Sequence, residues 1–493
     1  MKTEAETITI LKSDYDKLLF DYQNLSQQLR ELQRIIFGSK SERFIPAIDG
    51  QIDLFTQTAL VEEQKAKESQ EITYTRTLSK KEKKQPVRAV LPAHLPRVEE
   101  IIEPYEIEPG SKKIGEEVTE ILEYNPANIY VRKIVRPKYA KPDNKGVIIA
   151  NMPSLPLPKS NAGASMLAQI SVSKYIDHLP FYRQQQIFKR QQLDISPSTM
   201  GGWFSGTAKL LELLYQTLQK EILKNTTYLQ ADESPIGVQD SHKKGALHQG
   251  YMWLFRKPET GMTLFVYNQG RSREAPEDIL KDFTGTLQTD GYKVYQILST
   301  KGQITLLGCM AHARRYFEKA LDNDKKRAEY VLTEIQKLYE IERDLKEIGA
   351  NYQGIKIERQ KLAIPILTEL KTWLEKASFE VLPKSAIGKA IAYTLKLYTN
   401  LSRYVEQGMF EIDNNKIENA VRPLAIGRKN YLFAGSHHAA QNAAMMYSFF
   451  ASCKQNDINP FTWLHDVLHR INEHKGNKLS ELLPNNWTKL EKK

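Results

Sequence analysis

Cysteine is almost missing from this chain of 493 residues, which contains only Cys309 and Cys453. Two cysteines can form neither a framework of several disulfides nor a four-cysteine zinc site within one chain. The sequence has no run approaching about 18 apolar residues, and its first residues are polar and lack the apolar core of a signal peptide. These absences predict an intracellular protein without a membrane span, with the cytoplasm as its compartment.

The composition is that of a folded and moderately basic protein. Hydrophobic residues make up 41% of the chain, with 24 tyrosines and 17 phenylalanines, which favours packed cores over disorder. The length predicts roughly three or more domains. The formal net charge is +11. This excess favours a polyanionic partner such as DNA, although an ordinary basic protein is the simpler alternative.

A heptad pattern occupies the first segment. From Leu11 to Ile36, leucine, isoleucine or tyrosine recurs at alternating intervals of four and three residues without a slip. This spacing keeps one apolar seam on the helix and predicts a coiled coil over 1–44. We therefore expect a homo-oligomer formed through residues 1–40. The alternative is an amphipathic helix that packs on its own domain.

Two weakly patterned segments follow. Residues 45–90 are polar and basic and are predicted to be a linker, which is a solvated tether with enough charge to contact DNA phosphates. Residues 91–158 alternate short β-rich runs with prolines, and 129–136 is the clearest strand candidate. We expect a small β-containing module there.

The segment 162–224 is predicted to be helical. A polar, basic helix at 182–192 ends in a short break, and Ser196 and Pro197 then provide an N-cap and a first helical residue for a second helix toward Trp203. Two short helices around a tight break fit a helix-turn-helix, whose second helix enters the DNA major groove. Two ordinary packed helices are an equally good interpretation.

Three short acidic motifs are spaced along the second half of the chain. They are Ala-Asp-Glu-Ser around Asp232, Thr-Asp-Gly-Tyr around Asp290, and Asp-Asn-Asn-Lys-Ile-Glu ending at Glu418. The runs between the first two predict three strands, a helix and a strand, followed by another strand and helix. This order is the ribonuclease-H-like ground plan, with the two aspartates ending neighbouring strands.

The third motif is predicted to follow a helical insertion at about 313–400. A brief helix then carries Glu418, because Pro423 disfavours its continuation. The predicted fold is thus multidomain α/β, with a ribonuclease-H-like core and its insertion over 225–435 and a helical C-terminal region over 436–493.

Three converging carboxylates suit magnesium or manganese, because these ions prefer oxygen ligands. Two such ions about 3.5–4 Å apart would flank a phosphate, one activating water or a DNA 3′-hydroxyl and the other stabilising the leaving oxygen. Cys309 and His312 have a ligand-like spacing but lack partners, so we expect no zinc. We assign supporting roles to Asn415 and His312. The candidate contacts to the DNA backbone are Arg315, Lys416, Arg422, Arg428 and Lys429.

Each acidic motif also has a purely structural interpretation. Asp290 and the glycine after it form a strong tight-turn pair that could close a hairpin. Asn415 and Glu418 have the spacing of a capping box, in which Glu418 would bond only backbone amides. Asp232 could cap a turn. Two neighbouring acids are alternative candidates for the catalytic role: Glu233 and Glu411.

Taken together, these motifs resemble those of transposases of the insertion-sequence-66 family. The resemblance covers nearly the whole chain and adds four further segments to the heptads and the acidic motifs: 36–43 (Ile-Phe-Gly-Ser-Lys-Ser-Glu-Arg), 135–140 (Val-Arg-Pro-Lys-Tyr-Ala), 178–183 (His-Leu-Pro-Phe-Tyr-Arg) and 309–315 (Cys-Met-Ala-His-Ala-Arg-Arg). It implies a DNA transposase that cuts and joins strands at terminal inverted repeats and acts on target DNA at the nucleoid. Small accessory proteins of the same element are implied partners. The implied acid triad is Asp232, Asp290 and Glu418.

One departure from that family removes an expected metal. The family's middle region commonly carries a cysteine zinc finger just after Pro-Lys-Tyr-Ala, whereas 141–143 here is Lys-Pro-Asp and no cysteine precedes Cys309. The zinc finger is therefore not carried over. Two other functions are compatible with the pattern: a catalytically silent DNA-binding relative, and a structure-specific nuclease on the same fold.

Overall fold

A computed structural model describes the following residues: 129, 138–140, 147–149, 154–158, 160–240, 246–300 and 302–489. The chain divides into two units, one of residues 48–152 and the other of residues 1–47 with 153–493. In the first unit, β1 (Lys138–Ala140) and β2 (Val147–Ile149) form an antiparallel pair. The predicted coiled coil, the linker and nearly all of the strand candidate at 129–136 lie outside the described residues.

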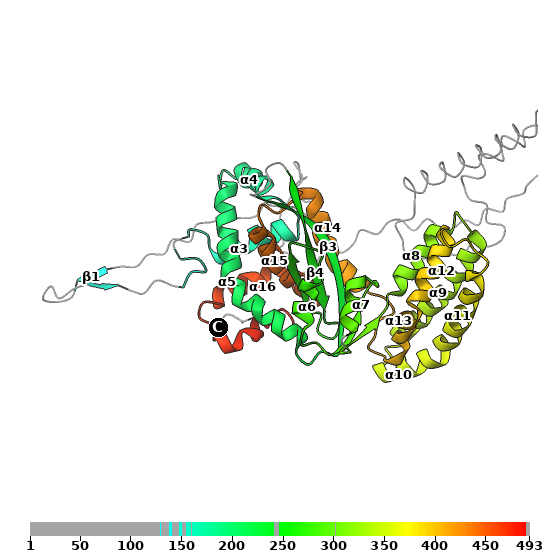
Figure 1. Cartoon of the computed structure of the whole chain (residues 1–493). Coiled ribbons are helices and arrows are strands. Elements are labelled where there is room, and N and C mark those ends of the chain that lie inside the picture. Colours follow the sequence, from blue (N-terminus) through cyan, green and yellow to red (C-terminus); the bar gives the residue numbers. More distant parts are fainter. Residues whose placement is uncertain are drawn as a thin grey trace, which may run out of the picture. The chain divides into compact units, whose positions relative to one another are not determined.

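The second unit is built on a five-stranded mixed sheet with strand order β5-β4-β3-β6-β7 (Figure 1). Strands β3, β4 and β5 are antiparallel, whereas β6 and β7 run parallel to β3. The strands are β3 (Tyr228–Gln239), β4 (Leu247–Arg256), β5 (Thr263–Asn268), β6 (Gly285–Gln288) and β7 (Ile304–Leu307). Helix α6 (Glu274–Leu280) separates β5 from β6, so the predicted order of elements is confirmed. A mixed α/β core of this kind is consistent with a ribonuclease-H-like domain.

Two details of the sheet differ from the prediction. Strand β3 does not end at Asp232 but continues to Gln239, because its second half pairs with β4 from Glu233↔Trp253 to Gln239↔Leu247. The two-residue alternation of buried Ile236 and Val238 supports this pairing. A helix that was not predicted, α7 (Lys293–Ser299), lies between β6 and β7.

Helices on one side of the sheet form the larger hydrophobic core. Helix α15 is buried along most of its length and contacts β5 most extensively, so its run of alanine, methionine and phenylalanine is a core sequence. Figure 1 shows this group beside the sheet. Its members are α3 (Ala164–Tyr175), α5 (Pro197–Leu223), α15 (His437–Gln455) and α16 (Pro460–Arg470).

A second core lies in a bundle of helices that also packs on β7. The helical character predicted for 313–400 is confirmed, and the bundle extends beyond both ends of that range. It comprises α8 (Met310–Ala320), α9 (Lys325–Glu347), α10 (Tyr352–Glu358), α11 (Ile364–Ser378), α12 (Ala386–Lys396) and α13 (Tyr398–Ser402). Helix α8 is its link to the sheet, since it follows β7 directly.

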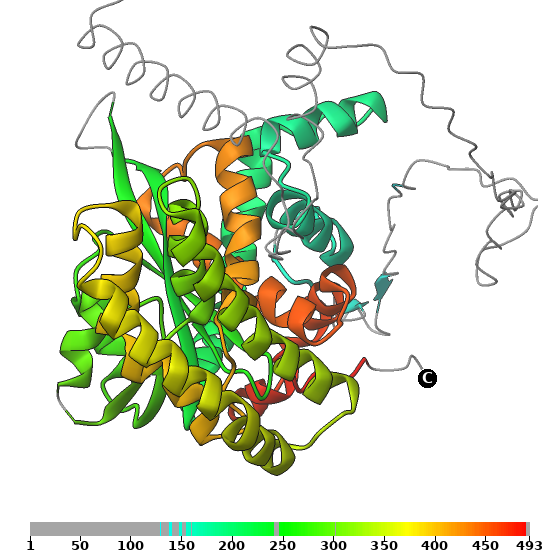
Figure 2. The ribbon, with the colours of Figure 1, turned by 90° about the vertical axis from the view of Figure 1, so that its right-hand side faces the viewer.

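The helix that carries Glu418 is longer than predicted. Helix α14 runs from Asn415 to Tyr431 with Pro423 inside it, so the expectation of a brief helix was wrong. Proline removes one backbone hydrogen bond, but the fully buried Ile417 and Leu424 hold the helix against the core on both sides of it. In Figure 2, α14 (orange) stands between the sheet and the helices α3 and α5.

The predicted pair of helices after residue 162 is present. Helix α4 (Phe181–Arg190) is followed by a short break and by α5, whose N-cap Ser196 accepts a hydrogen bond from the Thr199 amide. The second helix is 27 residues long, so it does not end near Trp203 as expected. Beyond its first turns the helix belongs to the core, because Leu211, Leu214 and Leu218 are fully buried, and the helix-turn-helix stays a prediction. Among the described residues, no helix is both long and apolar enough to cross a membrane.

Candidate active site

Strand register brings the two aspartates together. Gln230 of β3 is paired with Gln288 of the parallel neighbour β6. Asp232 and Asp290 each lie two residues further along, so they occupy matching positions and share one face by the alternation of the strands. Neighbouring strands are about 4.8 Å apart. Sequence positions 58 residues apart therefore meet at one point of the sheet.

Asp290 sits where β6 gives way to a turn. Its Oδ1 accepts a hydrogen bond of 2.9 Å from the Tyr292 amide, and Gly291 has a φ of +90°, which favours glycine. The chain then enters α7 and returns as the parallel strand β7. Asp290 therefore does not close a hairpin, and that structural interpretation is wrong.

Glu418 lies in the first turn of α14, where Arg315 of α8 holds its carboxylate. Two hydrogen bonds join them, from Nη1 to Oε1 at 3.2 Å and from Nη2 to Oε2 at 2.5 Å. His312, one turn earlier on α8, places Nδ1 3.7 Å from Oε1 of Glu418. The N-cap of α14 is Asn414, whose side chain makes no capping bond. The capping-box interpretation of Glu418 is thus contradicted.

The pKa of Asp232 is raised, partly by other acidic residues nearby. Burial, together with the neighbouring charges of Glu233, Asp290 and Glu418, raises its pKa to about 8, against the lowering effect of a hydrogen bond from the Glu233 amide. Asp290 and Glu418 therefore both lie close enough for their charges to act on Asp232. Partly buried oxygen donors that repel each other in this way fit a divalent cation, which would relieve the repulsion.

The two alternative acids are engaged elsewhere. Glu233 follows Asp232 on β3 and accepts a hydrogen bond of 2.5 Å from Nη2 of Arg271, and its charge is among the causes of the raised pKa of Asp232. Glu411 forms an ion pair with Lys416, 2.5 Å from Nζ to Oε1. The third carboxylate of the site stays a prediction, with Glu418 as our assignment.

Cys309 joins His312 and Glu418 in a group whose ligand atoms lie within 4.8 Å of one another. In the sequence, Cys309 and His312 lacked a third ligand, and the structure places Glu418 beside them. Burial raises the pKa of the Cys309 thiol well above its usual range, which favours the protonated form, whereas zinc binds the thiolate. The absence of a zinc site stays a prediction, and this donor set gives no reason to change it.

Comparison with known proteins assigns the fold to a family. Residues 159–442, more than half of the chain, match the model described as "Transposase IS66 family". The chain belongs to the IS66 family of transposases. Two further models match the IS66 transposase outside this core: residues 24–99 match the family's leucine-zipper model, described as "Transposase C of IS166 homeodomain", and residues 448–485 match the "IS66 C-terminal element".

Three uncharacterized proteins of Sinorhizobium fredii are similar to this IS66 transposase over most of their length. The protein y4jD is 31% identical over 80% of this chain and 81% of its own length. The protein y4hP is 29% identical over 94% and 88%, and y4qI is 30% identical over 94% and 89%. Membership of this family of acid-triad transposases implies catalysed transposition, DNA binding and use of divalent metal, and the leucine zipper suggests oligomerisation.

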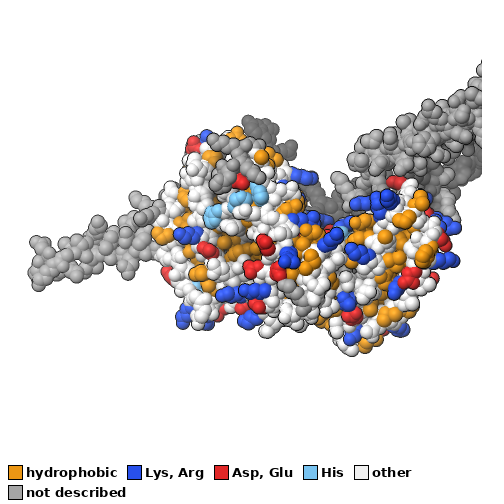
Figure 3. All heavy atoms as spheres, viewed as in Figure 1, with side chains coloured by type: hydrophobic (Ala, Val, Ile, Leu, Met, Phe, Trp, Pro, Cys, Tyr) orange, Lys and Arg blue, Asp and Glu red, His pale blue; other side chains and the backbone are white. Residues whose placement is uncertain are grey.

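The structure separates the candidate DNA contacts of the IS66 transposase into two groups. Lys416 is paired with Glu411, and Arg428 donates to Oγ of Ser234 at 3.2 Å and to the Pro235 carbonyl, so both have partners within the fold. Arg422 and Lys429 lie on the exposed side of α14. Figure 3 shows lysine and arginine side chains gathered where α14 meets the α8–α13 bundle.

Asn415 of the IS66 transposase is hydrogen-bonded to the acidic residue two positions before it. Its backbone amide and its side-chain Nδ2 both donate to the Asp413 carboxylate, at 3.0 and 2.9 Å. Its contribution is to fix the start of α14. The supporting role assigned to it from the sequence is therefore local to this turn.

Sequence reasoning missed two buried glutamines of the IS66 transposase beside the aspartates. Gln230 and Gln288 are both fully buried, and each precedes a triad aspartate by two residues. The repeated pattern Gln-x-Asp was a signal for them, because residues two apart on a strand share a face.

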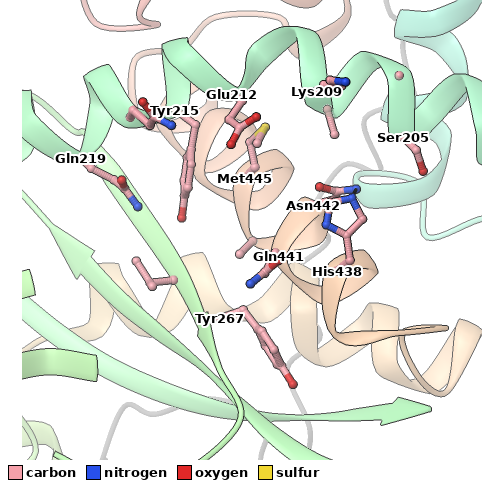
Figure 4. A pocket seen from close by; sticks show the side chains of 15 residues that line it. Ser205, Lys209, Glu212, Tyr215, Gln219, Tyr267, His438, Gln441, Asn442 and Met445 are labelled. Atoms are coloured by element: carbon pink, nitrogen blue, oxygen red, sulfur yellow. Dashed lines mark hydrogen bonds between the residues drawn. The ribbon is translucent and has the colours of Figure 1, made fainter. Parts of the chain in front are cut away.

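One cavity in the described part of the IS66 transposase is lined by residues outside the triad. It has a volume of about 740 Å³ and is bounded by α5, β5 and α15 (Figure 4). Lys209, Glu212 and His438 line it together with Tyr267. These lining side chains include acidic, basic and neutral groups, and this mixture does not select a ligand class.

Proposed function

We propose that this chain cleaves and joins DNA strands at the terminal inverted repeats of an insertion sequence, in a reaction that depends on magnesium or manganese. The observation that carries the proposal is the strand register that sets Asp232 beside Asp290. The charges of Asp290 and Glu418, which help to raise the pKa of Asp232, support it. We assign the catalytic role to Asp232, Asp290 and Glu418.

The three carboxylates would hold two divalent ions. Bound there, these ions would supply activation of the attacking oxygen and stabilisation of the leaving oxygen in an in-line displacement. Arg315 would fix the position of the Glu418 carboxylate through its two hydrogen bonds. Asp232 must lose the proton that its raised pKa of about 8 favours, and the positive charge of a ligated ion lowers that pKa.

DNA would contact surfaces on either side of this site. Arg422 and Lys429 offer exposed positive charge on α14, in the part of the helix that follows the turn carrying Glu418. Helices α4 and α5 provide a helix-turn-helix whose second helix is suited to the major groove. A homo-oligomer formed through residues 1–40, with small accessory proteins of the same element, would bring two DNA ends together.

The test is a strand-cleavage and strand-joining assay with the full chain. DNA carrying the element's terminal inverted repeats is incubated with Mg²⁺ or Mn²⁺ and a target DNA, and we expect cleaved ends and joined products that disappear with a chelator. DNA with scrambled ends is the control. Hydrolysis without joining would support the nuclease alternative, and binding without any metal-dependent cleavage would support the silent relative. Either outcome contradicts the proposed function.

A further inference from the structure

Two buried amide side chains lie directly beneath the proposed metal site. Gln230 and Gln288, called the glutamine pair below, face each other across β3 and β6, and the Gln230 Nε2 donates to the Gln288 Oε1 at 2.8 Å. Both are fully buried. Buried amides are costly unless their hydrogen bonds are made, so their partners show what they hold.

Gln288 uses all four of its hydrogen-bonding positions. Its Nε2 donates to the carbonyls of Glu411 at 2.8 Å and Gly308 at 3.0 Å. Its Oε1 accepts from Gln230 and from the Tyr228 hydroxyl, the latter at 2.6 Å. One side chain thus joins four parts of the chain: strands β6 and β3, the end of β7 and the segment 411–413.

Gln230 binds the same segment from the neighbouring strand. Its Nε2 lies 3.0 Å from Oε2 of Glu411 and 3.3 Å from the Asp413 carbonyl. Its Oε1 accepts a hydrogen bond of 2.8 Å from Arg256, another buried residue. The Glu411 amide in turn donates to the Tyr228 hydroxyl at 3.1 Å. Residues 411–413 are therefore tied to the sheet through side chains and backbone alike.

This segment leads straight into the helix of the third carboxylate. Helix α14 begins at Asn415, and Glu418 lies in its first turn. The same segment is tied to α8, because the Met310 amide donates to the Ile412 carbonyl at 3.1 Å. Fixing residues 411–413 thus fixes where α14 starts and in which direction Glu418 points.

We propose that the glutamine pair consists of positioning residues, which set the distance from Glu418 to Asp232 and Asp290 that a shared divalent ion requires. The inference rests on the proposed function and deepens it. The glutamines do not contact the ion themselves, but each is rigidly connected to an aspartate by two residues of strand. Groups that orient metal ligands in this way typically contribute about 10- to 100-fold to metal affinity or activity.

The test measures Mn²⁺ binding to the full chain without DNA, from the electron paramagnetic resonance signal of the free ion. Gln288→Met keeps the volume and removes every hydrogen bond of the amide, and we expect the Mn²⁺ dissociation constant to rise about 10- to 100-fold. Ser452→Ala is the matched control. It removes buried hydrogen bonds of 2.9 and 3.2 Å to Thr263 at the far edge strand β5, and its Mn²⁺ affinity should stay that of the wild type.

A purely structural role predicts a different pattern. Both variants would then lose thermal stability alike, with Mn²⁺ affinity unchanged in Gln288→Met, and this result would overturn the inference. Gln230→Met, which frees the Asp413 carbonyl, gives the same comparison if Gln288→Met does not fold. Asp290→Asn separates the role of the glutamine pair from the metal site itself. If Asp290→Asn leaves Mn²⁺ binding intact, the metal site and the proposed function fail. If Asp290→Asn weakens Mn²⁺ binding and the glutamine variants do not, only the role of the glutamine pair is overturned.

Discussion

Asp290→Asn lowers the rate of strand cleavage by about 10²- to 10³-fold or more, while binding of the DNA ends stays near that of the wild type. The amide is nearly the same size as the carboxylate and keeps an oxygen for the hydrogen bond from the Tyr292 amide, so the turn after β6 is retained. What is lost is the negative charge that draws a divalent ion to the sheet. Single-turnover cleavage and a gel-shift titration on the same inverted-repeat DNA measure the two quantities.

A matched variant controls for the change of net charge. Asp278→Asn alters an exposed carboxylate on α6, away from the triad, and should leave the cleavage rate unchanged. If Asp290→Asn cleaves as fast as Asp278→Asn, then Asp290 is not a metal ligand and the assignment of the triad is wrong.

Asp232→Asn stabilises the metal-free protein at pH 8, by on the order of 2 kcal/mol in the free energy of unfolding. The folded-state pKa of Asp232 is raised from 3.8 to about 8, because burial and neighbouring acids disfavour its charge. Below the unfolded-state value, both states are protonated and the carboxyl has no effect. Between the two values the unfolded state ionises first, so the acid destabilises the fold increasingly up to pH 8. The gain from asparagine should therefore be smaller at pH 5.

Divalent ions should reverse the difference in stability between the wild type and Asp232→Asn. An ion that binds only the folded state stabilises it in proportion to the logarithm of ion concentration, so saturating Mn²⁺ should raise the stability of the wild type more than that of Asp232→Asn. Urea unfolding followed by circular dichroism at pH 5 and pH 8, with and without Mn²⁺, measures all four cases. An asparagine variant that is less stable at both pH values and responds to Mn²⁺ like the wild type would contradict the account.

Much of the core could be predicted because its signals are local. The strand runs before Asp232 and Asp290 and the turn residues between β4 and β5 gave the order of elements that the sheet has. The length of β3 was missed, since Ser234 and Pro235 interrupt its apolar pattern, and pairing with β4 overrides that interruption. Helix α14 was predicted too short for a related reason: burial of Leu424 outweighs the hydrogen bond lost at Pro423.

Long-range contacts were beyond prediction from the sequence. Arg315 and Glu418 are 103 positions apart, and nothing in either motif shows that the arginine binds the carboxylate. Lys416 and Arg428 carry the charge that suits a DNA backbone, yet their partners lie within the fold. The charge of a residue therefore did not show whether it has a partner within the fold, as Lys416 and Arg428 do, or is exposed, as Arg422 is.

The central claim is that three carboxylates distant in sequence share bound metal, and iron-directed cleavage of the protein backbone tests it most directly. Fe²⁺ in place of magnesium, with ascorbate and peroxide, generates hydroxyl radicals that cut the chain near the bound ion. The account predicts cuts close to Asp232, Asp290 and Glu418 in the same sample, suppressed by excess Mg²⁺ and lost in Asp290→Asn. Cuts confined to the neighbourhood of Cys309, or unchanged in Asp290→Asn, would contradict a metal site formed by the triad.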